Sequence, residues 1–371
     1  MREQDKFRGC LFGGAIGDAL GYSVEFMHIN QIQEKYGENG ITSYDPENGA
    51  ARISDDTQMT LFTANGLLIG KTRRNLRGIS GTPEDYCWYC YKAWLTTQSE
   101  NYNSWKSSVD DVSAEFPWLI RIPELHNSRA PGNTVISALK NDRPGTLAQP
   151  LNESKGCGGL MRVAPIGLYF ENLDMDTLSL FGAKNAALTH GHDLGYIPAA
   201  ALVYIINRII YENNAMLEKI INDCIGKMKA LFQDKPHIGD FSALIEKSIR
   251  LSKSSQNDVD AISELGAGWV AEETLAIAVY CSLKYSSNFE KAIIASVNHS
   301  GDSDSTGSVT GNIMGAIHGY EKIPEKFTSS LELKETIIEI ADDLYFDCRI
   351  YEYQTEPFTE EDIKWYNKYA C

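Results

Sequence analysis

Apolar residues recur every three or four positions along most of this chain, which is the spacing of one face of an α-helix. Alternating apolar and polar positions, the pattern of a half-buried strand, are scarce. The periodicity therefore predicts an all-α fold. The predicted helices cover residues 5–21, 57–70, 83–98, 134–140, 176–188, 196–212, 215–232, 241–252, 269–285, 289–297, 305–319 and 334–346.

Two stretches depart from this periodicity. Residues 99–128 are polar, with Trp105 and Trp118 as isolated apolar anchors, and they predict a long surface excursion. After Pro357, Thr359 is followed three residues later by Asp362, a capping pattern that predicts one short helix. No linker rich in Pro, Ser or Gly divides the chain, so we expect a single domain over 1–371, with 321–371 as a C-terminal extension packed on the core.

Glycines recur every fourth residue in two of the predicted helices, as Gly9, Gly13, Gly17 and Gly21 and as Gly307, Gly311, Gly315 and Gly319. A glycine inside a helix costs roughly 1 kcal/mol relative to alanine, so each series needs an offsetting gain. A spacing of four keeps each series on one face, where another backbone can approach closely. Helix termination explains only the last glycine of each series. We therefore predict that both helices are closely packed at the centre of the fold, with each other as one candidate pair.

Two carboxylate clusters stand near opposite ends of the chain, each immediately before an apolar helical stretch. They are Ser-Asp-Asp-Thr at 54–57 and Gly-Asp-Ser-Asp-Ser at 301–305. Taken alone, each cluster is explained as a helix cap, because Ser and Asp satisfy the free amides of a first helical turn. Taken together, they suit hard divalent cations, which prefer oxygen ligands. The pair therefore predicts a two-metal site assembled from both ends of the fold.

The charge and cysteine content limit the partners and the location. The formal net charge of -16 disfavours nucleic acid and anionic membranes as partners, since both are polyanions. No uninterrupted run of 18 apolar residues is present, so we expect neither a membrane span nor a signal peptide. The eight cysteines show no regular disulfide spacing, and free thiols are typical of a reducing compartment. We expect a cytoplasmic location.

Several segments, in the same order along the chain, resemble the signatures of the ADP-ribosylglycohydrolase family. They run from about residue 7 to residue 320. The quoted segments are Gly-Gly-Ala-Ile-Gly-Asp-Ala-Leu-Gly at 13–21, Val-Glu-Phe at 24–26, Ser-Asp-Asp-Thr-Gln-Met at 54–59, Arg-Ala-Pro-Gly-Asn-Thr at 129–134, Gly-Cys-Gly-Gly-Leu-Met-Arg-Val-Ala-Pro at 156–165, Leu-Thr-His at 188–190, Gly-Ala-Gly-Trp-Val-Ala-Glu-Glu at 266–273 and Gly-Asp-Ser-Asp-Ser at 301–305.

The resemblance implies a compact orthogonal multi-helix bundle, two Mg²⁺ or Mn²⁺ ions, and hydrolysis of the bond between ADP-ribose and an acceptor. Carried over by position, the metal ligands are Ser54, Asp55, Asp56, Asp302, Asp304 and Ser305. Catalysis is assigned to Glu25, on the loop over the metals, with Asp55, Asp56 and Asp304. The substrate-binding residues are Gly132, Asn133, Thr134, Gly156, Cys157, Gly158, Gly159, Leu160, Met161, Arg162, His190, Gly195 and Trp269.

The chain departs from the family pattern at a few of these positions. Cys157 stands where Asn is frequent, and Ser300 stands where a second Gly is frequent. No carboxylate is lost, which favours an enzyme acting on ADP-ribose or an ADP-ribosylated protein. Two alternatives stay open. One is a non-catalytic relative that binds ADP-ribose or neutralises a toxin, and the other is a metallophosphatase that uses the same ions.

Overall fold

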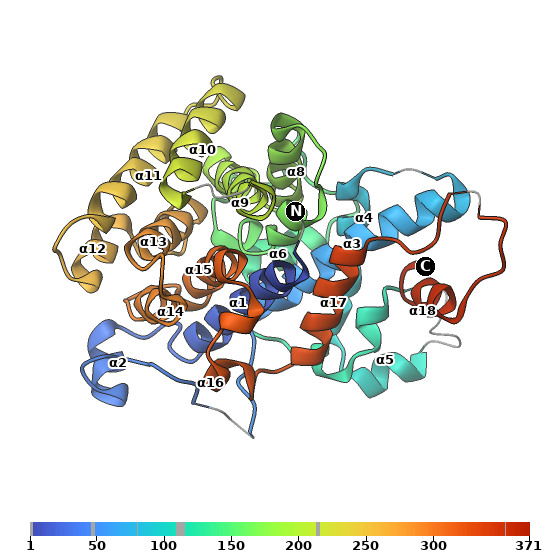
Figure 1. Cartoon of the computed structure of the whole chain (residues 1–371), viewed down its shortest axis with the longest axis horizontal. Helices are drawn as coiled ribbons and strands as arrows, with labels where there is room; N and C mark the ends of the chain where they lie inside the picture. The colour runs from blue at the N-terminus through green and yellow to red at the C-terminus, as the bar shows by residue number, and fades with distance from the viewer. Residues whose placement is uncertain (1–2, 46–48, 80, 109–115, 213–215, 353) are drawn as a thin grey trace.

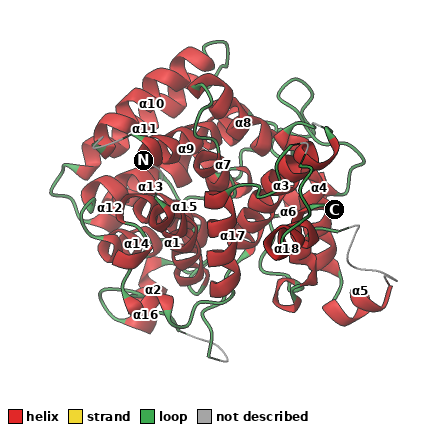
Figure 2. Ribbon diagram, turned by 45° about the vertical axis from the view of Figure 1, so that its right-hand side comes forward, coloured by secondary structure: helices red, strands yellow, loops and turns green. Residues whose placement is uncertain are grey.

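The computed structural model describes residues 3–45, 49–79, 81–108, 116–212, 216–352 and 354–371. Helices make up the regular structure of these residues (Figures 1 and 2). In the first half of the chain they are α1 (Gln4–Tyr22), α2 (Ile29–Tyr36), α3 (Asp55–Arg77), α4 (Pro83–Ser99), α5 (Tyr102–Ser108), α6 (Asn133–Leu139), α7 (Ala164–Tyr169), α8 (Met175–Ala187) and α9 (Asp193–Tyr211), with 3-10 turns η1 (Trp118–Arg121), η2 (Pro123–Leu125) and η3 (Cys157–Gly159).

The second half continues in the same way. Its helices are α10 (Leu217–Leu231), α11 (Ile238–Ser252), α12 (Asp258–Leu265), α13 (Ala271–Lys284), α14 (Phe289–Val297), α15 (Ser303–His318), α16 (Glu325–Thr328), α17 (Lys334–Phe346) and α18 (Glu360–Tyr369), with the 3-10 turn η4 (Tyr320–Lys322). Within the described residues, extended pairing is limited to isolated bridges between Ala51 and Leu331 and between Gly156 and Val270. The all-α prediction is confirmed.

The two glycine-rich helices lie side by side and antiparallel near the middle of the molecule, as α1 and α15 (Figures 1 and 2). A Cβ atom added at Gly13 would overlap the carbonyl oxygen of Gly311, and one added at Gly17 would overlap the carbonyl oxygen of Gly307. The close approach of the two backbones therefore offsets the low helix propensity of glycine. The prediction of close central packing is confirmed, and the two helices are each other's partner.

Helix α9 forms a second part of the core. It packs against α7, α8, α10 and α13. Within the described residues it is the one helix with the length and hydropathy of a membrane span, and 89% of its apolar window is buried inside the protein. A helix that is apolar on all sides and enclosed by other helices has the character of a core helix.

The polar segment 99–128, predicted as a surface excursion, includes both exposed and buried residues. It contains α5 and the turns η1 and η2, while residues 109–115 lie outside the described part of the chain. Trp105, Leu119 and Ile120 are buried, so the two ends of the segment contribute to the core.

The C-terminal extension packs on α3 through α17 and α18. Trp365 is buried and its indole nitrogen donates a hydrogen bond of 2.9 Å to the hydroxyl of Thr72 on α3. The predicted capping pair is present, because Thr359 and Asp362 bond reciprocally at the start of α18. The short helix expected after Pro357 is confirmed.

Candidate active site

The first turns of α3 and α15 bring the two carboxylate clusters together. Ser54 caps α3 by accepting a hydrogen bond from the amide of Asp56, and Asp302 caps α15 by accepting one from the amide of Ser305. The hydroxyl of Ser305 donates to Oδ2 of Asp56 at 3.3 Å, which links the two turns directly. The capping interpretation is therefore correct. The two capped turns also lie next to each other.

A carboxylate that the sequence analysis did not single out holds the first cluster in place. Asp18 on α1 is fully buried, and it accepts hydrogen bonds from the amides of Ser54 and Thr57 at 2.9 and 3.0 Å and from the hydroxyl of Thr57. Burial and the nearby charge of Asp304 raise the pKa of Asp18 to about 7. The signal in the sequence was an Asp inside the apolar, glycine-rich stretch 9–21 of α1.

Glu25 lies over the same cluster on the loop that follows α1. One carboxylate oxygen from each of Glu25, Asp302 and Asp304 lies within 4.8 Å of the other two. Burial, followed by the charges of Asp304, Asp302 and Asp55, raises the pKa of Glu25 to about 10. Without a cation, the Glu25 carboxyl is therefore protonated at neutral pH.

Negative charge is concentrated among four buried carboxylates, as in a cation site. The exposed fractions of Asp55, Asp56, Asp302 and Asp304 are all 5% or less, and no ion pair within the described part of the chain involves them. Burial and mutual repulsion raise the pKa of Asp55, Asp56 and Asp302 well above the usual value. Oδ1 of Asp56 and Oε2 of Glu25 are buried without a hydrogen-bond partner among the described residues. Oxygen ligands of this kind fit Mg²⁺ or Mn²⁺.

The glycine-rich segment lies beside the carboxylates. The turn η3 begins after Gly156, and the Cys157 thiol donates to Oδ2 of Asp302 at 2.9 Å. The amide of Cys157 donates to the carbonyl of Trp269 at 3.3 Å. The segment therefore joins the second cluster to the residues just before α13.

The last three residues of the predicted substrate-binding segment turn their side chains inward. The side chains of Leu160, Met161 and Arg162 are buried in the protein interior. The guanidinium of Arg162 donates to the carbonyl of Asn185 and the hydroxyl of Thr189, both at 2.9 Å. The side chain of Arg162 therefore anchors the segment to the interior, and the assignment of Leu160, Met161 and Arg162 to substrate binding stays a prediction.

His190 lies directly beneath the glycine-rich turn. A Cβ atom at Gly156 would lie 3.4 Å from the Nε2 atom of His190. Burial, and then the charge of Arg162, lower the pKa of His190 to about 3, so the ring is neutral at physiological pH. Gly195 packs against the backbone just before this turn, because a Cβ atom at Gly195 would lie 2.9 Å from the carbonyl oxygen of Ser154.

The segment 132–134 begins α6 near the first carboxylate cluster. The amide of Asp55 donates to the carbonyl of Arg129 at 3.0 Å, which holds the loop before α6 next to the start of α3. Gly132 and Asn133 are exposed, and the hydroxyl of Thr134 lies 3.1 Å from the hydroxyl of Ser154. The segment therefore connects the rim of the first cluster to the start of the glycine-rich segment.

Trp269 is on the surface and is not a core residue. It is 41% exposed, and its ring stacks on the ring of Phe26 with centroids 5.4 Å apart and planes inclined by 22°. Phe26 follows Glu25, has a φ of 66°, and is 67% exposed. The two aromatic rings therefore form an accessible surface beside the Glu25 loop.

This chain is similar to known proteins in sequence and in fold. The sequence model of the ADP-ribosylglycohydrolase family matches residues 1–352. The chain belongs to the ADP-ribosylglycohydrolase family. Family membership extends the earlier resemblance over almost the whole chain and accounts for the order of the motifs.

Relatives of this chain occur in bacteria and animals. It is 27% identical to ADP-ribosylhydrolase ARH3 of Bos taurus over 380 residues, covering 93% of each chain. It is 24% identical to ADP-ribosyl-[dinitrogen reductase] glycohydrolase of Rhodospirillum rubrum, covering 89% of this chain and 91% of that protein. A solved structure described as an ADP-ribosylglycohydrolase-related protein complex superposes with a TM-score of 0.60 at 22% identity, covering 92% of this chain and 98% of that one, which shows the shared fold.

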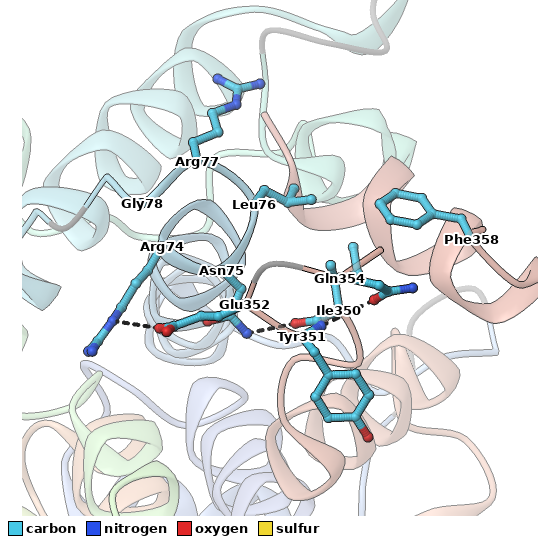
Figure 3. Close-up of a pocket in the computed structure, with 10 residues that line it drawn as sticks. All are labelled: Arg74, Asn75, Leu76, Arg77, Gly78, Ile350, Tyr351, Glu352, Gln354 and Phe358. Carbon is cyan, nitrogen blue, oxygen red and sulfur yellow. Dashed lines mark hydrogen bonds and ion pairs between the residues drawn. The ribbon is translucent and has the colours of Figure 1, made fainter. Parts of the chain in front are cut away.

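A cavity of about 970 Å³ lies at the other end of α3 and belongs to a different region (Figure 3). Its lining comes from the last turn of α3 and from the segment 350–358. Arg74 pairs there with Glu352 at 3.2 Å, and Asn75 donates to the carbonyl of Ile350 at 2.7 Å. A helix rises by about 1.5 Å per residue, so the length of α3 separates this cavity from the carboxylates.

Proposed function

We propose that this protein is a metal-dependent hydrolase that releases ADP-ribose from an ADP-ribosylated acceptor. Water attacks the anomeric carbon of the proximal ribose, and the bond to the acceptor breaks. The acceptor is a protein side chain, such as arginine or serine, or another ADP-ribose conjugate. Support for hydrolysis of an ADP-ribosyl bond comes from family membership and from the relatives named for this activity.

The observation that carries the proposal is the set of buried carboxylates contributed by both ends of the chain. In the proposal, two Mg²⁺ or Mn²⁺ ions are held by Ser54, Asp55, Asp56, Asp302, Asp304 and Ser305. A bound divalent ion supplies positive charge next to the ribose and lowers the pKa of a water ligand. The unpartnered Oδ1 of Asp56 supports this assignment, because a buried carboxylate oxygen without a partner is costly.

Glu25 is proposed as the group that positions the attacking water and accepts its proton. A positive charge among the carboxylates favours the ionised form of Glu25, which the cluster alone disfavours. Asp55, Asp56 and Asp304 are proposed to stabilise positive charge on the ribose as the glycosidic bond breaks. The proximity of Asp304 to Glu25, and the effect of the charges of Asp304 and Asp55 on the pKa of Glu25, support a role in the same step.

The rest of ADP-ribose is proposed to extend along the segment 156–159 towards Trp269. Glycines leave backbone amides accessible to diphosphate oxygens. The neutral ring of His190 supports this turn from below and adds no charge. The exposed Trp269 offers a stacking surface, and Gly132, Asn133 and Thr134 complete the rim by the first cluster.

The competing function is a non-catalytic protein that binds ADP-ribose or neutralises a toxin on the same fold. Incubation with a panel of ADP-ribosylated acceptors and Mg²⁺ or Mn²⁺ separates the two. We expect free ADP-ribose with an intact diphosphate, and no release by Asp304→Ala. Binding without release by the unmodified protein would favour the competing function, and products with a cleaved diphosphate would indicate a phosphatase.

A further inference from the structure

We propose that His192, Asp193 and His237 form a second metal site, separate from the carboxylate cluster, for a transition-metal ion such as Zn²⁺. His192 precedes α9, Asp193 is its first residue, and His237 immediately precedes α11. One candidate ligand atom from each residue lies within 4.8 Å of the other two. The site goes beyond the proposed hydrolysis and does not depend on it.

The three side chains converge on one oxygen atom. Oδ1 of Asp193 lies 3.0 Å from Nδ1 of His192 and 2.8 Å from Nδ1 of His237. In a tetrahedral zinc site, ligand atoms about 2.0–2.1 Å from the metal are separated from each other by roughly 3.3 Å. Small movements of exposed rings therefore open enough space for an ion between these atoms. The imidazole rings already face each other, with centroids 4.7 Å apart.

Burial and neighbouring hydrogen bonds prepare this arrangement. Asp193 is buried, and its Oδ2 accepts a hydrogen bond of 3.0 Å from the backbone amide of His237, which fixes the loop before α11 against α9. The amide of Leu194 donates to Nδ1 of His192 at 3.1 Å and also to Oδ1 of Asp193 at 2.9 Å. The Leu194 amide therefore still has Asp193 as its acceptor when the ring of His192 turns towards an ion. The two histidine side chains are 21% and 40% exposed, which gives an ion access from solvent.

The donor atoms determine the class of ion. Two imidazoles and one carboxylate suit Zn²⁺, Co²⁺, Ni²⁺ and Cu²⁺, whereas Mg²⁺ prefers oxygen ligands only. The chain would then carry two sites of different chemistry. The second site is close to the glycine-rich segment, since the amide of His192 donates to the carbonyl of Ser154 at 3.3 Å.

The test is Zn²⁺ titration of the full-length protein by calorimetry in excess Mg²⁺, together with the visible absorption of bound Co²⁺. We expect His237→Gln to weaken Zn²⁺ binding about tenfold or more and to remove the Co²⁺ absorption of this site. His192→Gln should act in the same way, which keeps the test valid if one variant does not fold. The matched control is His318→Gln, because His318 lies outside the cluster and its Nε2 is 3.0 Å from the carbonyl oxygen of Ser286. Asp304→Ala should retain this site.

Equal Zn²⁺ stoichiometry and affinity in the unmodified protein and in both histidine variants would overturn the proposal. The cluster would then be a hydrogen-bonded contact, with His237 donating to Asp193. Loss of this Zn²⁺ site in Asp304→Ala with retention in His237→Gln would also overturn it, because the ion would then belong to the carboxylates. Neither result depends on whether the protein hydrolyses an ADP-ribosyl bond.

Discussion

The hydroxyl of Ser305 donates a hydrogen bond to the carboxylate of Asp56, a residue 249 positions earlier in the chain. Each of these residues lies in the first turn of a helix. Helix N-termini carry partial positive charge, so two of them meeting at one point favour a cluster of carboxylates. They do not neutralise it, since the pKa of Asp56 is still raised well above its usual value by burial and by the charge of Asp304.

Replacing Asp304 should reduce both metal binding and turnover. Asp304→Ala removes a carboxylate that faces Asp302 and Glu25, and we expect divalent-ion affinity to fall by about 100-fold or more. Calorimetric titration with Mn²⁺ and an ADP-ribose release assay measure the two effects. The control is Asp176→Ala, which removes a carboxylate paired with Lys227 on the surface. Two unperturbed ions in Asp304→Ala would refute the ligand assignment.

The ion-free protein should lose stability as the pH rises. Burial and neighbouring charges raise the pKa of Asp18 to about 7 and that of Glu25 to about 10. A carboxyl with a raised pKa in the folded state stabilises the fold fully below its unfolded pKa, and this contribution is lost as the pH rises through the folded pKa. In the presence of a chelator, Tm should therefore fall between about pH 5 and about pH 9. The Tm increase produced by Mg²⁺ should grow over the same interval. If Tm measured with a chelator does not fall as the pH rises, the argument that the buried, clustered carboxyls have raised pKa values is contradicted.

Glu25→Gln should affect the reaction more than the fold. The protonated Glu25 of the ion-free protein and a glutamine have similar size and no charge, so Tm should barely change near about pH 5, and towards about pH 9 the variant should lack the part of the Tm fall that Glu25 causes. Loss of the proton acceptor should reduce kcat by roughly 10²–10⁴-fold. Rates and Tm values measured between about pH 5 and about pH 9 check both expectations. Full activity across that range would show that Glu25 is not the proton acceptor.

Alanine in the glycine-packed interface should destabilise the protein strongly for so small a change. Gly311→Ala places a methyl group against the backbone of α1, and overpacking costs typically about 1–3 kcal/mol or more in the free energy of unfolding. Gly226→Ala on α10 is the matched control, because its Cβ would meet nothing within 4 Å. That control should gain roughly 0.5–1 kcal/mol from helix propensity. If denaturant unfolding shows that both variants change the free energy of unfolding in the same direction, the interpretation of the glycine series is wrong.

Removing the exposed indole should weaken ligand binding without affecting the ions. Trp269→Ala should cost roughly 1–3 kcal/mol in ADP-ribose binding, by analogy with base stacking. Tyr351→Ala provides the control, because Tyr351 is an exposed aromatic residue at the cavity beyond the far end of α3. ADP-ribose Kd and Mn²⁺ Kd are measured for both variants. Unchanged ADP-ribose affinity in Trp269→Ala would remove this residue from the proposed ligand path.

Periodicity predicted the fold class and the long helices because their apolar faces are read directly from local sequence. Each predicted helix has a counterpart, although α3 continues to Arg77 where an end at residue 70 was predicted. Gly78, with a φ of 64°, ends α3, which is the signal that was missed. Short helices such as α2 and α12 were also missed, because eight residues hold too few apolar positions to show a period.

The candidate site was accessible from sequence only where its chemistry is local. The clusters at 54–57 and 301–305 are visible as motifs, but the support by Asp18 arises only when α1 packs against the start of α3. The orientation of Arg162 was equally hidden. Its guanidinium turns inward because Asn185 and Thr189 offer acceptors in the interior, and those contacts depend on tertiary structure.

The pairing of α1 with α15 has a consequence for synthesis on the ribosome. Helix α1 ends at Tyr22, and its packing partner begins at Ser303. At about 5–20 residues per second, the glycine-rich face of α1 emerges tens of seconds before α15 can cover it. A chain released early would contain Asp55 and Asp56 without Asp302 and Asp304. Such a fragment would have neither the central contact of the fold nor a complete set of candidate metal ligands, so the proposed activity would be absent until α15 has been made.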